Sequence, residues 1–213
     1  MGGVCYHVIN RGNARAQVFH QEHDYDAFIR LMIDGKARRP MRVLAYCLMP
    51  NHFHLVLWPR QDGDLSRWMQ WLMTAHVRRY HGHYGGSGHV WQGRFKAFPI
   101  QQDEHLLTVW RYVEANPVRA GLARRGQDWA WSSLAEWCQG ASWQVVDAGP
   151  VERVRNWLSL VNRPLGEATL GQLRQSVNRG APWGDELWSR RTAARLGIES
   201  SMRRRGRPPQ TKK

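Results

Sequence analysis

The chain has 213 residues, and 31 Lys and Arg against 17 Asp and Glu give it a formal net charge of +14. A hydrophobic content of 42% with twelve tryptophans excludes a wholly disordered polycation. The length allows one substantial domain, alone or with a smaller appendage. Twenty-seven of the basic residues are arginine, whose planar guanidinium can bind two phosphate oxygens at once. The composition favours a polyanionic partner, nucleic acid first, although a GC-rich genome would also enrich arginine.

Three sequence features bear on the compartment. The three cysteines lie far apart with no C-x-x-C pair, which argues against a zinc ribbon and is typical of a reducing cytosol. No apolar run approaches the ~20 residues of a membrane span, and the N-terminus lacks the basic-then-apolar order of a signal peptide. We therefore expect a cytoplasmic, nucleoid-associated protein with no membrane partner.

The charge is unevenly distributed along the chain. Residues 1–150 hold 17 basic and 12 acidic residues, a net of +5, whereas residues 151–213 hold 14 and 5, a net of +9. We expect a domain boundary near Gly149-Pro150. Residues 1–149 would form the body, and residues 150–213 a basic helical C-terminal region ending in a disordered Arg-rich tail.

The first predicted elements are a strand and a helix. Residues 5–9 have strand character and stop at the turn signal Arg11-Gly12-Asn13. Asp24 is the predicted N-cap of a helix whose apolar residues follow at helical spacing until Gly35 ends it.

A hairpin and a long helix follow. Residues 41–49 and 52–58 are predicted strands joined by a Pro-Asn turn. Apolar residues from Leu65 onward recur at i, i+3 and i+4, which predicts an amphipathic helix continuing toward Tyr80. A polar, glycine-rich loop is expected over residues 81–88.

The last predicted elements of the body are a strand and a helix. A strand is predicted within residues 90–100, and Asp103 caps a final helix whose end is limited by Pro117 and Gly121. The order β-α-β-β-α-β-α is the ferredoxin-like or RRM-like order with one helix added. We therefore predict an α+β fold, an antiparallel sheet with helices on one face.

His52-Phe53-His54 is the sharpest local feature. Residues i and i+2 of a strand point to the same face, so both imidazoles project together from the predicted strand. Two adjacent imidazoles form a natural metal-binding half-site, and two surface histidines without a metal are the alternative, since H-x-H is common by chance.

Tyr112 and Asn116 form a second pair, because residues i and i+4 share a helix face. At about 100° per residue, Tyr112 lies roughly 110–120° and Asn116 about 80° from the centre of the apolar stripe, so neither occupies its middle. A boundary tyrosine and a capping asparagine would explain the pair without function. In the predicted order, however, this helix can bring the Asn116 carbonyl oxygen to the two imidazoles, as a third ligand that suits Mg²⁺ or Mn²⁺.

This arrangement predicts a particular chemistry. A divalent metal can grip two phosphate oxygens and polarise the phosphorus, and the phenol of Tyr112 would then be the nucleophile. The products would be a phosphotyrosine ester and a free hydroxyl. Because the linkage conserves the energy of the phosphodiester, rejoining needs no nucleotide cofactor.

The motifs resemble those of the single-tyrosine HUH transposases, where U is a bulky hydrophobe, and more closely the REP-associated tyrosine transposases. The similarity covers nearly the whole chain. It lies in YHVINRGNARAQVF, YCLMPNHFHLVLWP, HVWQGRFKAFPI, RYVEANPVRAGL, WAWSS and GDELWSRRTAARLGIESSMRRRGRP.

The resemblance implies an HUH palm fold over residues 1–149, with His52, His54 and Asn116 as metal ligands and Tyr112 as the nucleophile. It implies cleavage and rejoining of single-stranded DNA at hairpin-forming REP or insertion-sequence ends through a 5′-phosphotyrosine. Two subunits exchange tyrosine helices in simple insertion-sequence relatives, so monomer and homodimer both stay open. The alternatives are a domesticated, non-catalytic hairpin-binding regulator and a phosphodiesterase that uses water as nucleophile.

Basic side chains around these motifs are expected to contact DNA, with ordinary exposed surface as the alternative. The C-terminal Arg-Gly-Arg-Pro resembles the core of minor-groove AT-hook segments, and a generic solvated polycation is the alternative there. The candidate DNA-binding residues are Arg11, Arg94, Lys96, Arg119, Arg203, Arg204, Arg205 and Arg207.

Overall fold

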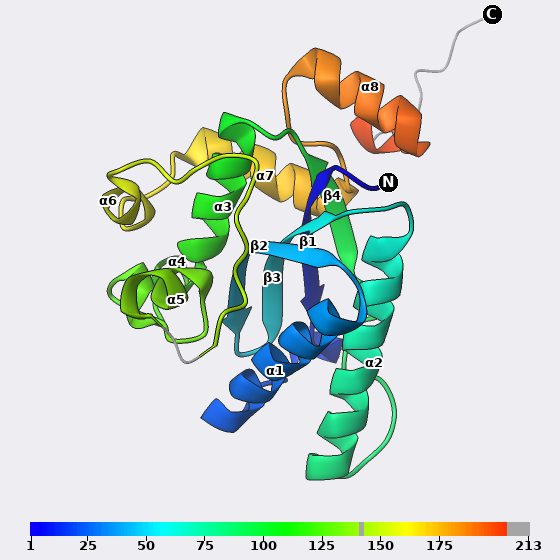
Figure 1. The fold of residues 1–213 in the computed structure, drawn as a ribbon, viewed down its shortest axis with the longest axis vertical. Coiled ribbons are helices and arrows are strands. Elements are labelled where there is room, and N and C mark those ends of the chain that lie inside the picture. The colour runs from blue at the N-terminus through cyan, green and yellow to red at the C-terminus, as the bar shows by residue number, and fades with distance from the viewer. Residues whose placement is uncertain (141–142, 204–213) are drawn as a thin grey trace, which may run out of the picture.

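A computed structural model describes residues 1–140 and 143–203 of the chain. At its centre is a four-stranded antiparallel sheet in the order β2-β3-β1-β4 (Figure 1). The predicted ferredoxin-like α+β fold is therefore confirmed, including the β2–β3 hairpin. The strands are β1 (Cys5–Arg11), β2 (Met41–Met49), β3 (His52–Pro59) and β4 (Lys96–Ile100).

Helices α1 (Glu22–Arg38) and α2 (Asp64–Tyr84) cover one face of the sheet. Alternate strand residues such as Val8 and Leu55 share a buried cluster with Phe28 of α1 and other apolar side chains of both helices. Because successive strand residues point to opposite faces, the residues between them, including both histidines of the H-x-H pattern, face the other side.

The other face of the sheet is covered as well, which adds a layer to the predicted one-faced arrangement. Leu106 of α3 (Glu104–Glu114) shares a buried cluster with strand residues such as Val56. Helices α6 (Trp157–Val161) and α7 (Glu167–Arg179) contribute to the same cluster. The C-terminal helices thus share a core with the body, and the division into two domains at residue 149 stays a prediction.

Short elements connect and follow these layers. Among the described residues, no helix is both long enough and apolar enough to cross a membrane. The remaining elements are η1 (Asn13–Arg15), α4 (Asn116–Arg119), η2 (Gly126–Asp128), α5 (Ser133–Gln139), α8 (Glu186–Leu196) and η3 (Glu199–Met202).

Three predicted helix boundaries are wrong. Asp24 lies inside α1 rather than before it, because its Oδ2 reaches back to accept from the backbone N–H groups of His20 and Gln21. Gly35 also lies inside α1, where a Cβ atom would come 2.8 Å from Nε1 of Trp68, so the glycine permits α2 to approach closely. Helix α2 continues to Tyr84 instead of giving way to a loop at residue 81.

Candidate active site

His52 and His54 lie side by side on β3, with ring centroids 5.0 Å apart. Nδ1 of His52 is 2.6 Å from Oδ1 of Asn51, so Nδ1–H donates to the amide and the lone pair of Nε2 stays available. Burial, with a contribution from the charge of Arg11, lowers the pKa of His52 to about 4. Burial also lowers the pKa of His54 well below its usual value. Both imidazoles are therefore neutral near pH 7, which is the form that binds a metal.

A third imidazole, which sequence reasoning missed, completes this cluster. His7 on β1 is fully buried, and its Nε2 lies 2.9 Å from Nδ1 of His54 with the two rings stacked. Burial lowers the pKa of His7 to about 3, so the hydrogen bond joins two neutral rings. Ile9 pairs with His54 across the β1–β3 ladder, which puts His7, two residues away, on the same face. The alternation of side chains along β1 determines which side chains share a face with His7. Only the position of β1 next to β3 in the sheet brings His7 to His54.

Tyr112, near the end of α3, meets the imidazoles edge-on. Its ring centroid is 5.7 Å from that of His54 and 6.1 Å from that of His7. Only 6% of the Tyr112 surface is exposed, although its angle from the apolar stripe indicated a boundary position. The C-terminal helices explain the difference, since Leu170 and Leu173 of α7 belong to the same buried cluster as Tyr112.

Asn116 begins α4 and caps the end of α3. Its Nδ2 donates to the backbone carbonyl of Tyr112 at 2.9 Å. This hydrogen bond satisfies a carbonyl group in the last turn of α3 and directs Oδ1 of Asn116 away from that helix. Arg119 donates to that Oδ1 at 3.2 Å, and its guanidinium lies 4.7 Å from the Tyr112 ring centroid. The oxygen keeps a second lone pair for a further partner.

One hollow of about 370 Å³, here called the site hollow, brings the predicted residues together. Two neutral imidazole nitrogens and an amide oxygen form a donor set with open positions, which fits a divalent cation such as Mg²⁺ or Mn²⁺. All the groups come from β3, α3 and α4 of a single chain. The site hollow is lined by Ile9, Arg11, Met49, His52, His54, Tyr112, Asn116, Arg119, Ala120, Arg174, Val177 and Asn178.

The other predicted DNA-binding residues lie outside the site hollow. Arg94 and Lys96 line an adjoining hollow of about 310 Å³ at the ends of β1 and β4. Arg203 lines a third hollow, beside η3. Arg204, Arg205 and Arg207 lie outside the described residues.

Another group of ligand-type side chains lies at the opposite end of α3. Asp103, Glu104 and His105 have donor atoms close enough for one metal ion. However, Oδ1 of Asp103 accepts from the backbone N–H of His105 and lies 2.7 Å from Nδ1 of the same residue. Helix capping accounts for this group, as the sequence predicted for Asp103.

A family model described as "Transposase IS200 like" matches residues 2–116. The chain belongs to this family. The match covers every strand of the sheet and extends through Tyr112 to Asn116.

Individual relatives agree with the predicted resemblance. A REP-associated tyrosine transposase of Escherichia coli (strain K12) is 27% identical over 136 residues, which span 62% of this chain and 77% of the relative. A putative REP-associated tyrosine transposase of Haemophilus influenzae is 30% identical over 106 residues, 45% of this chain and 60% of the relative. The solved "Structure of the REP associates tyrosine transposase bound to a REP hairpin" shares the fold, with a TM-score of 0.53 and 24% identity over 72% of this chain and 93% of that chain.

Proposed function

We propose that this transposase-family chain is a metal-dependent transesterase that cleaves and rejoins single-stranded DNA at hairpin-forming, REP-like sequences through a 5′-phosphotyrosine. The observation that carries the proposal is the meeting of Tyr112 with His54, 5.7 Å between ring centroids, in a hollow that also holds His52 and Asn116. Family membership supports DNA cleavage. The REP hairpin bound by the solved relative supports a hairpin as the DNA partner.

Each polar group has a role in this proposal. Nε2 of His52, Nε2 of His54 and Oδ1 of Asn116 would hold a Mg²⁺ or Mn²⁺ ion. The metal, when bound, supplies the charge that neutralises and polarises the scissile phosphate. His7 is a positioning residue in this proposal. With Nε2 of His54 as a metal ligand, Nδ1 of His54 carries the proton, and Nε2 of His7, 2.9 Å away, accepts its hydrogen bond and holds this tautomer.

In the proposed reaction, each step forms one phosphate ester bond and breaks another. Oη of Tyr112 attacks the phosphorus and its proton passes to solvent, while the bond from phosphorus to the 3′ oxygen breaks and that oxygen takes up a proton. Arg119, whose guanidinium lies over the ring, favours the developing phenolate. Attack by another 3′-hydroxyl on the phosphotyrosine then rebuilds a phosphodiester and frees the phenol.

The anchoring of α3 supports action of Tyr112 in cis. Glu114 is fully buried and accepts hydrogen bonds from Ser133 at 2.6 Å, from Trp157 at 2.7 Å and from Arg153 at 2.8 Å. These donors come from three later segments of the same chain. Exchanging the helix with a second subunit would require breaking this buried network, so we propose that one chain completes the reaction.

A covalent-adduct assay tests the proposed function. Hairpin DNA with a single-stranded extension is incubated with Mg²⁺ or Mn²⁺, and a protein–DNA adduct is expected for the wild type. Tyr112→Phe should abolish the adduct, whereas Tyr80→Phe, which removes a phenol from α2, should retain it. Hairpin binding without any adduct would favour the non-catalytic regulator, and multiple turnover by Tyr112→Phe would favour water as the nucleophile. Either result overturns the proposal.

A further inference from the structure

Three hollows meet at one residue of the C-terminal region, Asn178 of α7. It lines the site hollow, the hollow at the strand ends that holds Arg94 and Lys96, and the hollow beside η3. The first two also share Ile9, Arg11 and Val177. The hollows are therefore neighbours that follow one another from Tyr112, across the ends of β1 and β4, to η3.

Helix α7 forms a wall of this path because of the spacing of its side chains. Leu170, Leu173 and Ser176 are buried against the body. Arg174, Val177 and Asn178, at i, i+3 and i+4, share a neighbouring face of the helix and line the hollows. This helix lies outside residues 2–116, the part of the chain that matches the family model.

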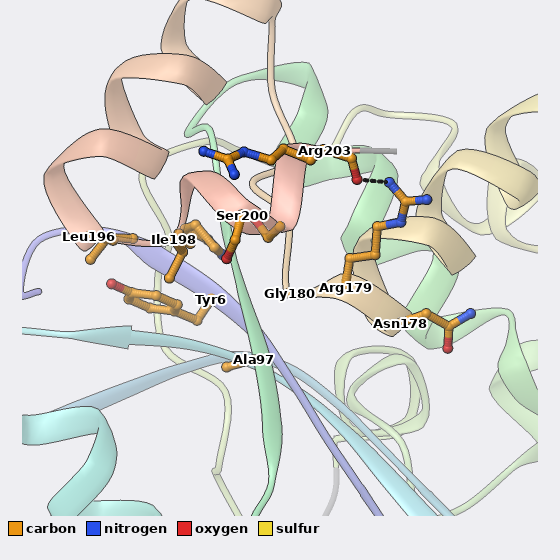
Figure 2. A pocket seen from close by; sticks show the side chains of 11 residues that line it. Tyr6, Ala97, Asn178, Arg179, Gly180, Leu196, Ile198, Ser200 and Arg203 are labelled. Carbon is orange, nitrogen blue, oxygen red and sulfur yellow. Dashed lines mark hydrogen bonds between the residues drawn. The ribbon is translucent and has the colours of Figure 1, made fainter. Parts of the chain in front are cut away.

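Figure 2 shows the far end of the path, the hollow beside η3. The ring of Tyr6 forms its floor under Leu196 and Ile198, and Arg179 extends toward the backbone of Arg203. Nη1 of Arg179 donates to the carbonyl oxygen of Arg203 at 2.8 Å, which connects α7 to the residue after η3.

The chemistry of the lining is that of a polyanion site. Among the described lining residues of the three hollows there is no carboxylate. Two buried donors, Nε of Arg11 and Oγ of Ser201, have no hydrogen-bond partner among the described residues. The seven basic residues along the path are Arg11, Arg119, Arg174, Arg94, Lys96, Arg179 and Arg203.

The size of the hollows indicates which polyanion fits. Their volumes are about 370, 310 and 490 Å³. These values fall at the low end of the roughly 300–1,000 Å³ of sites that hold one small ligand, so each hollow has room for a nucleotide-sized group. The amides of Gln92 and Asn178 can donate to base edges or phosphates along the way.

We propose that α7 and the ends of β1 and β4 form a channel for the single-stranded DNA next to the scissile phosphate, which passes Asn178 on its way from Tyr112 to the hollow of Figure 2. This inference rests on the proposed function for its direction, because the scissile phosphate is placed at Tyr112. It adds a DNA-binding wall contributed by Arg174 and Asn178, which were not among the predicted DNA-binding residues.

Binding measured without cleavage tests the channel. In the Tyr112→Phe protein with EDTA, fluorescence anisotropy compares a bare hairpin with hairpins that carry single-stranded extensions of increasing length. We expect affinity to rise with extension length. Arg174→Ala should reduce that gain about tenfold and lower the salt dependence by about one counterion, without changing affinity for the bare hairpin.

A matched pair of substitutions separates the channel from general charge effects. Asn178→Asp adds a carboxylate within the path at nearly constant size, and Gln175→Glu adds the same charge to an exposed site of α7 that lines none of the hollows. We expect only Asn178→Asp to abolish the gain from the extension. Equal losses from both variants, or no loss from Arg174→Ala, overturn the channel.

The outcomes also separate this inference from the proposed function. If the wild type forms the Tyr112 adduct but the extension gain is insensitive to Asn178→Asp, the channel is wrong and the chemistry stands. If no adduct forms but Asn178→Asp selectively abolishes the gain, the chain binds single-stranded DNA along this path without cleaving it at Tyr112.

Discussion

Replacing His7 with phenylalanine tests how the proposed metal centre is built. The variant keeps a ring beside Phe98, 4.9 Å away between centroids, but removes the acceptor that faces Nδ1 of His54 at 2.9 Å. With no partner for Nδ1–H at this buried position, His54 favours the other tautomer, whose Nε2 carries the proton and cannot bind a metal. Losing such an outer partner typically costs 10–100-fold in metal affinity, about 1.4–2.7 kcal/mol. That range agrees with the cost of about 1–3 kcal/mol for a buried polar group left unpaired.

Titration calorimetry with Mn²⁺ gives the affinity directly, and adduct formation against Mn²⁺ concentration gives it independently. His7→Gln is the matched control, since its side-chain carbonyl can accept from His54 and should recover part of the loss. High Mn²⁺ should restore adduct formation in His7→Phe, because the substitution leaves the nucleophile in place. A folded His7→Phe protein that binds Mn²⁺ as tightly as the wild type would refute the reasoning.

Four further predictions follow from the same contacts. Glu114→Gln removes the charge of a fully buried carboxylate that pairs with Arg153, and the free energy of unfolding, measured in urea, should fall by about 3–5 kcal/mol. Burial lowers the pKa of His76 to about 4, so the unfolded chain, with a histidine pKa near ~6.5, binds more protons between these values. Stability should therefore fall as pH drops through this window, by at most ~1.4 kcal/mol per pH unit from this group, and His76→Leu should remove that share in denaturation curves at pH 7, 6, 5 and 4. Chelation with EDTA should abolish the Tyr112 adduct, and added Mn²⁺ or Mg²⁺ should restore it on denaturing gels. Deleting residues 198–213 should flatten the salt dependence of DNA binding, followed by anisotropy, while adduct formation persists.

Local sequence patterns were sufficient for the sheet and the two helices on its first face. The strand formers on both sides of Pro50-Asn51 gave the hairpin, and the stripe from Leu65 gave α2. These signals are local, since residues close in sequence determine them. The errors at Asp24 and Gly35 arose where a side chain bonded backward or where a neighbouring helix set the packing.

The second helical layer and His7 needed long-range information. The helices over residues 157–179 show short apolar patterns that do not say which surface they bury, and only the fold puts Leu173 of α7 in the cluster that contains Tyr112. The contact of His7 with His54 likewise depends on β1 lying next to β3. The alternation of side chains along a strand places each histidine on one face of the sheet, but the sheet topology decides which strand lies next to it.

The structure also changes what the uneven charge means. The sequence divides into a mildly basic body and a strongly basic end. This division suggested that basic residues of the body position the DNA and that the basic end attracts it without positioning it. Arg174 and Arg179 belong to the basic end, yet they lie on a helix whose Leu173 is buried with the body. Arg174 lines the site hollow together with Arg11 of the body, and Arg179 lines the hollow beside η3 together with Tyr6 of the body. Charge along the chain and layers in space therefore divide the molecule differently. Part of the C-terminal charge, on Arg174, therefore lies in the same hollow as Tyr112. In the proposed function this charge would act on the position of the DNA strand as well as on its affinity.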